Sequence, residues 1–226
     1  MIDNIDIYSY GDSSMIIKSK KKNNKDLTLI YQALNSTNFD GVDDIIKTVS
    51  TIGLIFNPYK TKYSKLKNQI TSLIVKINPL YKDKDVKEWK IPVCYSKNYG
   101  LDLEYLSNKL KLSTENIIKY HKESTYKVSM IGFLPGFVYL DYNNPILNIP
   151  RKNTPRSSIP DGSIAIARNQ TGIYNLNSPG GWNIIGKTPK KLFNKEGNPP
   201  IKIKEGDIVK FYEIDEKKFK NISRQE

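Results

Sequence analysis

Cysteine, histidine and arginine are scarce in this sequence of 226 residues, and long apolar runs are missing from it. Cys94 is the only cysteine, so an internal disulfide is excluded and an oxidising compartment is not expected. The longest apolar runs, such as residues 52–56, are far too short to span a bilayer. The polar start MIDNIDIYSY does not resemble a secretory leader. These shortages predict a cytoplasmic protein with no membrane-spanning segment.

Acidic residues are outnumbered, and the formal net charge of +13 raises the question of nucleic acid binding. The lysines are spread over nearly every polar stretch, for example at 18–22, 60–67 and 202–220. The sequence has no zinc-finger spacing, aromatic RNA-binding strand motif or helix-turn-helix pattern. The lysines are therefore interpreted as a solvated surface, and no nucleic acid partner is expected.

Arginine is distributed differently from lysine. Of the four arginines, Arg151, Arg156 and Arg168 fall within one short stretch, and only Arg224 lies elsewhere. A guanidinium group binds a carboxylate or a phosphate in a two-point geometry that an ammonium group cannot copy. The cluster favours an anion-binding site, with chance placement on the surface as the alternative.

The pattern of apolar residues predicts an α+β chain with two domains, residues 1–88 and 89–226. In the first, strands are expected at 14–18, 42–46 and 51–56, with amphipathic helices around 27–34 and 63–74. A further strand at 89–95 completes the order β-α-β-β-α-β, which is typical of a small ferredoxin-like α/β domain. The charged, irregular stretch at 78–90 indicates a boundary near residue 88.

The second part begins with two helical segments and continues as short strands. Leu103, Leu106 and Leu110 carry the first helix, and Ser113 is expected to cap the second, which runs to about His121. From residue 125 onward, strands are expected at 126–130, 164–166, 172–176, 182–186, 201–204 and 207–214. Many short strands separated by glycine and proline turns indicate a barrel or a sandwich.

Residues 131–189 contain the glycines, prolines and arginines that suggest a site. Gly180 and Gly181 allow close backbone approach to a ligand, and Trp182 could form an apolar wall, with barrel corners as the alternative. The octapeptide GWNIIGKT at 181–188 satisfies the phosphate-loop pattern. Its apolar middle favours a strand, and Pro189 follows it, so an ATP-binding loop is not expected here.

Several blocks occur in order in this second part: YGLDL, HKESTYKV, GFLPGFVYL, two Pro-Arg pairs, IPDGSIAIA, QTGIY, and SPGGW followed by IIGKTP. Together they resemble the KipI / 5-oxoprolinase B subunit / allophanate hydrolase subunit 1 family, strongly over residues 91–214 and loosely before them. The resemblance implies a cyclophilin-like β-barrel after the small α/β domain. The chain departs from the family at Ser96 and Lys97, where two glycines are usual, and at Asn175, where a proline is usual.

The resemblance also implies that the chain works within a complex. The expected partners are a companion C subunit (KipA / allophanate hydrolase subunit 2-like) and a LamB/YcsF-like A subunit, which together hydrolyse 5-oxoproline, a small amide, to glutamate. This chain is expected to be inactive alone and to bind no cofactor by itself, while the complex uses ATP. Two alternatives stay open: an inhibitor of a sporulation-type histidine kinase, and a subunit of a urea- or allophanate-processing amide hydrolase.

The candidate site combines residue types with the resemblance, and no metal site is expected. The candidate catalytic residues are His121, the only histidine, which could polarise a lactam or carboxylate, and Arg156, which could hold a carboxylate or a phosphorylated intermediate. A helix-end position favoured by the dipole is the alternative for His121. The candidate substrate-binding residues are Arg151, Gln170, Thr171, Ser178, Pro179, Gly180, Gly181 and Trp182.

Overall fold

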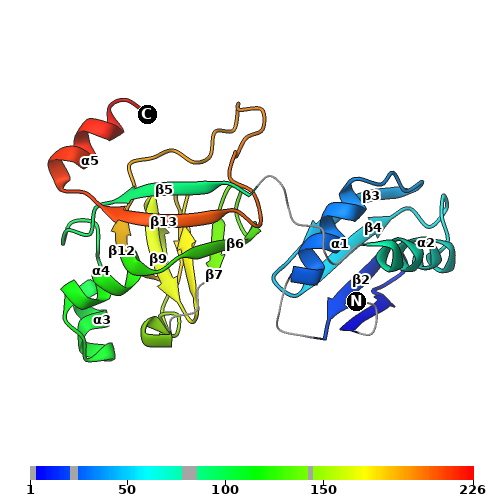
Figure 1. Cartoon of the computed structure of the whole chain (residues 1–226), viewed down its shortest axis with the longest axis horizontal. Coiled ribbons are helices and arrows are strands. Elements are labelled where there is room, and N and C mark those ends of the chain that lie inside the picture. Colours follow the sequence, from blue (N-terminus) through cyan, green and yellow to red (C-terminus); the bar gives the residue numbers. More distant parts are fainter. Residues whose placement is uncertain (1–3, 21–24, 78–85, 142–144) are drawn as a thin grey trace. The chain divides into compact units, whose positions relative to one another are not determined.

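The computed structural model describes residues 4–20, 25–77, 86–141 and 145–226. The chain divides into two compact units, Met1–Lys84 and Asp85–Glu226, each with its own hydrophobic core (Figure 1). Both units combine helices with β-sheet, so the chain is an α+β protein, as the sequence predicts. Among the described residues, no helix is both long and apolar enough to cross a membrane.

The first unit is a four-stranded antiparallel sheet packed against two helices. In chain order it contains β1 (Ile5–Ser9), β2 (Ser14–Ser19), α1 (Lys25–Asn35), β3 (Val42–Lys47), β4 (Thr51–Phe56) and α2 (Tyr63–Lys76). The strands are ordered β1-β2-β4-β3. Alternate residues of β2, Met15 and Ile17, are buried together with the apolar stripes of both helices. The alternating residues of the strand and the apolar residues spaced three or four apart on the helices therefore pack in one core.

The predicted ferredoxin-like order is wrong in two respects. The prediction omits β1, which pairs antiparallel with β2. It also assigns the strand near Trp89 to the first sheet, whereas this strand, β5 (Glu88–Val93), pairs in parallel with a strand of the second unit. The first unit therefore has the order ββαββα. The partner of a strand depends on long-range register, which the apolar pattern of one segment does not contain.

The second unit places two helices, α3 and α4, and a short 3₁₀ turn, η2, among its strands, and ends in the helix α5. After β5 it contains α3 (Leu103–Leu110), α4 (Thr114–Glu123), β6 (Tyr126–Ile131), β7 (Val138–Asp141), η2 (Pro145–Leu147), β8 (Arg156–Ile159), β9 (Ser163–Ala167), β10 (Gln170–Ile173), β11 (Ser178–Gly180), β12 (Asn183–Lys187), β13 (Ile208–Glu213) and α5 (Glu216–Ser223). Strands β8 and β11 pair separately as a two-stranded sheet.

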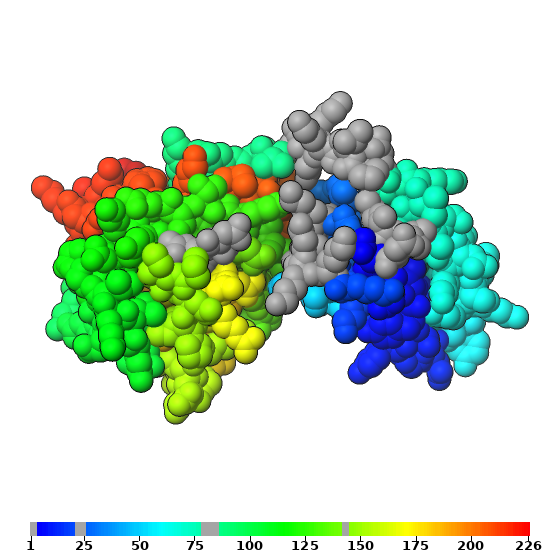
Figure 2. Space-filling model, turned by 60° about the horizontal axis from the view of Figure 1, so that its bottom comes forward, coloured from blue at the N-terminus to red at the C-terminus, as the bar shows by residue number. Residues whose placement is uncertain are grey.

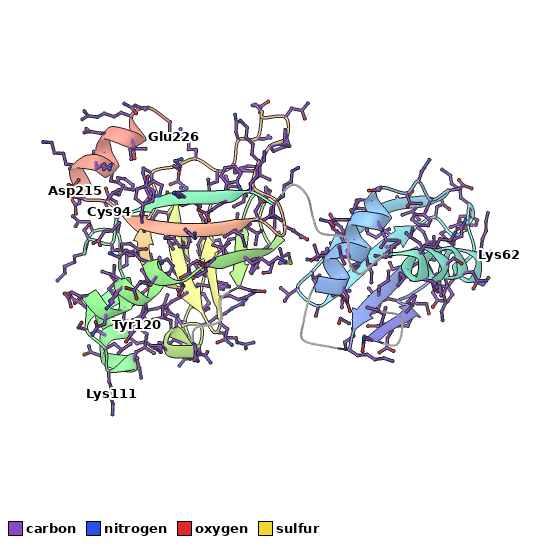
Figure 3. The ribbon with its side chains drawn as sticks, viewed as in Figure 1. Lys62, Cys94, Lys111, Tyr120, Asp215 and Glu226 are labelled. Atoms are coloured by element: carbon purple, nitrogen blue, oxygen red, sulfur yellow. The ribbon has the colours of Figure 1, made fainter. Side chains whose placement is uncertain are left out.

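The other seven strands form one mixed sheet in the order β12-β9-β10-β7-β6-β13-β5. Its edges meet, because Cys94, directly after β5, and Lys187, at the end of β12, exchange backbone hydrogen bonds of 2.8 and 3.0 Å. In Figure 3, Cys94 and Asp215 lie toward the same end of β5 and β13, as the parallel pairing of these strands requires. The sheet is therefore a nearly closed barrel, and whether it is cyclophilin-like in detail stays a prediction.

The barrel wall has an apolar cluster on each side. Ile164 and Ile166 of β9 belong to the large core inside the barrel. Because side chains alternate along a strand, Ala165 points to the other side, where it packs in a second cluster with Trp182. Ile159 of β8 also belongs to this outer cluster. The outer cluster supports the candidate site.

Local signals of the sequence predict parts of this unit well. Ser113 caps α4, because its Oγ accepts a hydrogen bond of 3.2 Å from the Asn116 amide. Strand β12 occupies the middle of the GWNIIGKT block, and the next described element is β13 instead of the helix that a phosphate loop needs. The expected strand at 201–204 forms only an isolated bridge between Ile201 and Phe193. Strands β7, β8 and β11 are too short, at three or four residues, for a readable pattern.

The segment after β5 is tied to α5. Ser96, at a position where the family has glycine, donates a hydrogen bond of 2.6 Å to Glu216 Oε1, and Asn98 donates one of 2.8 Å to the same oxygen. The rings of Tyr99 and Phe219 stack with centroids 4.4 Å apart. The departure at Ser96 therefore adds a side-chain contact to the last helix.

Candidate functional site

A cavity of about 280 Å³ lies beside the outer cluster of the barrel wall. Its walls come from the β6–β7 loop and β7, the loop before β8, the residue after β10, and the β11–β12 connection. The lining residues are Phe133, Phe137, Tyr139, Arg151, Pro155, Tyr174, Pro179, Gly180, Gly181 and Trp182. Half of this set is aromatic and Arg151 is its only charged member, so the cavity suits a small ring-shaped or planar anion.

Close packing against glycine shapes the aromatic wall. A Cβ atom at Gly172 would lie 2.6 Å from Phe137 Cζ and 3.0 Å from Trp182 Cζ3. A Cβ atom at Gly180 would lie 2.5 Å from the Tyr174 hydroxyl. Phe137 contacts Tyr174 edge-on, with ring centroids 4.8 Å apart. Because these two positions carry no side chain, the rings of Phe137, Tyr174 and Trp182 can pack close to the backbone and to one another.

Arg151 is the charged residue of the cavity lining. Its guanidinium carbon lies 5.6 Å from the centroid of the Trp182 ring, and the residue is exposed. Within the described part of the chain, Arg151 forms no ion pair or side-chain hydrogen bond. In Figure 2 the yellow-green segments around residues 145–165 lie at the surface of this unit. The fork of Arg151 can therefore accept an anion from solvent without first giving up an internal partner.

Two tyrosine hydroxyls supply the neutral polar groups of the cavity. Burial raises the pKa of Tyr174 to about 12, and it also raises the pKa of Tyr139, although the positive charge of Arg151 opposes the effect in both. Both hydroxyls are therefore protonated at neutral pH. They can donate hydrogen bonds to a ligand oxygen while the aromatic rings contact its apolar part.

Phe133 stands at the rim of the cavity in an unusual backbone conformation. Its φ angle is +73°, in the left-handed region that is strained for a bulky residue, and its side chain is 63% exposed. Its ring meets Phe137 edge-on at 5.7 Å. Asn175, where the family usually has proline, donates a hydrogen bond to the carbonyl of Gly136 in the same loop. That bond ties the segment after β10 to the β6–β7 loop.

Arg156 does not reach the cavity, because it is paired with an internal carboxylate. Its Nη1 and Nη2 atoms donate hydrogen bonds of 2.8 Å to the two oxygens of Asp102. Lys152 donates a further bond of 2.8 Å to Asp102 Oδ1, and the Ile184 amide donates one of 2.7 Å to Oδ2. The fork of Arg156 is therefore occupied by Asp102, and the expectation that Arg156 holds a substrate carboxylate stays a prediction.

The charge of Asp102 is stable in this setting. Burial raises the pKa of Asp102, but hydrogen bonds from Arg156, Lys152 and the Ile184 amide outweigh burial and hold the pKa below its usual value. The carboxylate stays ionised at neutral pH and keeps both cationic partners.

His121 is also separated from the cavity. Its side chain is completely buried, its Nδ1 lies 2.8 Å from the Tyr95 hydroxyl, and its ring stacks on Phe211 at 4.7 Å. Burial lowers the pKa of His121 to about 3, so the imidazole is neutral at physiological pH. His121 is not among the residues that line the cavity, and the expectation that it polarises the substrate stays a prediction.

The predicted substrate-binding residues fall into two groups. Arg151 and the run Pro179, Gly180, Gly181 and Trp182 line the cavity together. Ser178, Gln170 and Thr171 do not line it. Gln170 Nε2 donates a hydrogen bond of 2.8 Å to Asp141, while the buried Thr171 and Ser178 hydroxyls have no hydrogen-bond partner among the described residues.

The sequence interpretation includes Trp182 and misses the other four aromatic residues of the cavity lining. Phe133, Phe137 and Tyr139 belong to the GFLPGFVYL block, and Tyr174 ends the QTGIY block. Their density within two blocks is the signal that could have found them, because aromatic side chains gather where small ligands bind. Asp102, in the YGLDL block, is missed because its role depends on cations about fifty residues away.

Comparison with known proteins agrees with the fold and with the sequence blocks. A family model described as "Carboxyltransferase domain, subdomain C and D" matches residues 5–203, which reach into both units. The 5-oxoprolinase B subunit of Bacillus subtilis (strain 168) is 35% identical over 227 residues, covering 94% of this chain and 94% of that protein.

Solved structures extend the comparison to longer chains. The crystal structure of TTHA0988 has 28% sequence identity and a TM-score of 0.77, covering 89% of this chain. This chain spans only 40% of the length of TTHA0988. The urea amidolyase of K. lactis has a TM-score of 0.78 at 16% identity, covering 98% of this chain and 15% of that chain, which shows a shared fold alone. The chain therefore belongs to the carboxyltransferase subdomain C and D family, within the group that contains the B subunit of 5-oxoprolinase.

Proposed function

We propose that this chain is the B subunit of an ATP-dependent 5-oxoprolinase, which hydrolyses 5-oxoproline to glutamate. The observation that carries the proposal is the 35% identity to the 5-oxoprolinase B subunit of Bacillus subtilis, over 94% of both chains. At that coverage both units of this chain are compared, so the proposal does not rest on the barrel alone.

The cavity supports the proposal through its chemistry. 5-Oxoproline is a five-membered lactam that carries one carboxylate, and the cavity combines one free guanidinium with aromatic walls and two hydroxyl donors. Arg151 binds the carboxylate, Trp182 and Phe137 contact the ring, and the hydroxyls of Tyr139 and Tyr174 face the lactam group. No charged group besides Arg151 lines the cavity in the described chain, so the hydrolytic machinery comes from elsewhere.

The reaction requires groups that a partner supplies. A lactam carbonyl is a poor electrophile, and transfer of the ATP γ-phosphoryl group to its oxygen makes the carbon reactive toward water. The developing negative charge then needs cationic or hydrogen-bonding groups aimed at it. In this chain Arg156 and Lys152 are engaged by Asp102, and GWNIIGKT is a strand instead of a phosphate loop. These features support the proposal that ATP binds on a companion protein of the complex and that this chain alone is inactive.

We place the complex in the cytoplasm, with a companion C subunit and a LamB/YcsF-like A subunit. The name of the Bacillus relative, which designates it as one lettered subunit of 5-oxoprolinase, supports a multi-subunit enzyme. The length of TTHA0988, of which this chain spans 40%, supports association with further protein segments. Cys94 is a free, buried thiol, which agrees with a reducing compartment.

Reconstitution tests the proposal. The chain is purified alone and with the two companion proteins, and release of glutamate from 5-oxoproline is measured with and without ATP. We expect turnover only from the complex and only with ATP. Turnover of urea or allophanate in place of 5-oxoproline would assign the chain to the alternative amide hydrolase. Absence of any turnover, with tight binding to a histidine kinase, would assign it to regulation.

A further inference from the structure

One buried carboxylate, that of Asp102, is hydrogen-bonded to two segments that form walls of the cavity. Asp102 lies directly before α3, and its side chain is 3% exposed. All four of its described side-chain hydrogen bonds reach segments that build the cavity: one from Lys152, two from Arg156 and one from the Ile184 amide. Lys152 directly follows Arg151 and Arg156 directly follows Pro155, whereas Ile184 follows Trp182 by two residues.

Backbone bonds reinforce this arrangement. The Asp102 amide donates a hydrogen bond of 2.9 Å to the Ile184 carbonyl, so its main chain and its side chain both hold the same residue. The Lys152 amide donates a bond of 2.7 Å to the Gly181 carbonyl, which joins the two walls directly. A Cβ atom at Gly100 would lie 2.7 Å from the Ile185 carbonyl, so the start of α3 is pressed against β12. Asp102 therefore has little freedom to move away from either wall.

The charges of this group explain why Asp102 is needed. Without the Asp102 carboxylate, Arg156 and Lys152 would be two partly buried cations that share no counter-ion. Both also lie near Arg151 in the sequence. Like charges separate when their common counter-ion is lost, and a bidentate guanidinium–carboxylate pair fixes orientation as well as distance. Loss of the carboxylate would therefore loosen the loop that holds Arg151 beside Trp182, leaving it tied by the backbone bond from Lys152 to Gly181.

We propose that Asp102 is the positioning residue of the cavity, acting through Arg156, Lys152 and the Ile184 amide to hold Arg151 and Trp182 in one binding geometry. Asp102 itself does not touch the ligand, since it is absent from the cavity lining. The choice of ligand rests on the proposed function, whereas the positioning of the two walls does not.

The test is Asp102→Asn in the reconstituted complex, with Asp207→Asn as a matched control. Asp207 is another buried carboxylate of this unit, 3% exposed, which accepts hydrogen bonds from the Trp89 indole at 2.7 Å and from the Lys87 and Lys204 amides at 3.0 and 2.9 Å. None of these partners lines the cavity. The control therefore reports what the loss of a buried, hydrogen-bonded carboxylate does to stability alone.

We expect Asp102→Asn to raise the KM for 5-oxoproline by at least about tenfold, with a smaller change in kcat, because misplacing a binding group weakens substrate binding. Asp207→Asn should lower the melting temperature without changing KM. The double variant Asp102→Asn/Arg156→Gln should have nearly the same KM as Asp102→Asn, because the two residues act as one unit.

A second readout needs no substrate. Hydrogen exchange in the complex should accelerate at residues 150–156 and 180–184 in Asp102→Asn, and not at these segments in Asp207→Asn. If Asp102→Asn does not assemble, Arg156→Lys keeps the charge, loses the two-point bond and should show the same pattern in milder form. Unchanged exchange at both walls, or an equal KM effect from the control, would overturn the proposal. Accelerated exchange in a complex that does not turn over 5-oxoproline would support the positioning role and reject the proposed function.

Discussion

Arg151 gives the most direct test of the site, through the substitution Arg151→Gln. Glutamine keeps a polar side chain of moderate length and removes the positive charge and the fork. Because Arg151 is exposed and has no ion pair within the described chain, the substitution should cost no more than the contact with the Trp182 ring, about 0.5–1 kcal/mol of the free energy of unfolding. An effect on ligand binding would then not be explained by unfolding.

The expected size of the effect follows from the contact that Arg151 is free to make. A hydrogen bond between charged groups contributes about 1.5–3 kcal/mol. The contact between Arg151 and the Trp182 ring is present without a ligand, at 5.6 Å, so it contributes little to the difference between free and bound states. Since about 1.4 kcal/mol corresponds to a tenfold change, the Kd for 5-oxoproline should rise about 10- to 150-fold.

Two ligands make the assay specific for the carboxylate. Calorimetry on the complex would measure binding of 5-oxoproline and of 2-pyrrolidinone, which keeps the lactam ring and lacks the carboxylate. Arg151→Gln should weaken the first and leave the second within about twofold. Arg168→Gln serves as the control, because Arg168 is exposed at the turn between β9 and β10 and does not line the cavity.

The reasoning would be refuted by any of three results. Equal binding of 5-oxoproline to the wild type and to Arg151→Gln would mean that the cavity cation does not hold the carboxylate. An equal loss for both ligands would mean that Arg151 shapes the cavity instead of recognising charge. An effect of Arg168→Gln as large as that of Arg151→Gln would point to general electrostatic attraction.

Two further predictions concern stability. His121 has its ordinary pKa of 6.5 in the unfolded chain and a pKa of about 3 in the folded chain. The free energy of unfolding should therefore fall as pH drops from 6.5, by up to about 1.4 kcal/mol per pH unit. Urea unfolding between pH 7 and 5 should show this slope, and it should be absent in His121→Gln; a slope that persists would contradict the burial. Phe133→Gly should relieve the positive φ angle and leave the free energy of unfolding unchanged or raised by about 0.5 kcal/mol. Its Kd for 5-oxoproline should rise about two- to tenfold, because an aromatic contact at the rim is lost, and a variant that loses stability as well would argue against strain.

The sequence predicts the features that depend on local pattern. The Ser113 cap, the helix at Leu103–Leu110 and the strand within GWNIIGKT need only neighbouring residues, and the structure agrees. The partner of β5 depends on a strand more than a hundred residues away, which no local pattern contains. The predicted ferredoxin-like order is wrong partly for this reason and partly because it omits β1.

The candidate site, like the fold, could be predicted from the sequence only in part. Arg151 and Arg156 follow prolines in similar contexts, and nothing in the sequence says which guanidinium is free. The difference arises because Asp102 meets Arg156 in space and leaves Arg151 unpaired within the described chain. The burial of His121, which neutralises it and removes it from solvent, could not be read from the sequence because it depends on the packed helix and on the Phe211 stack.

The parallel pairing of β5 with β13 also governs how the nascent chain can fold. Glu88 pairs with Ile208, so the barrel cannot close until almost the whole second unit has been synthesised. Until then, β5 lacks its main strand partner and β6 lacks one of its two neighbours. Contacts between distant segments form slowly, and unpaired strand edges attract other chains. Closure of this barrel is therefore a late event in biosynthesis, and the interval before it is when the chain is most exposed to aggregation.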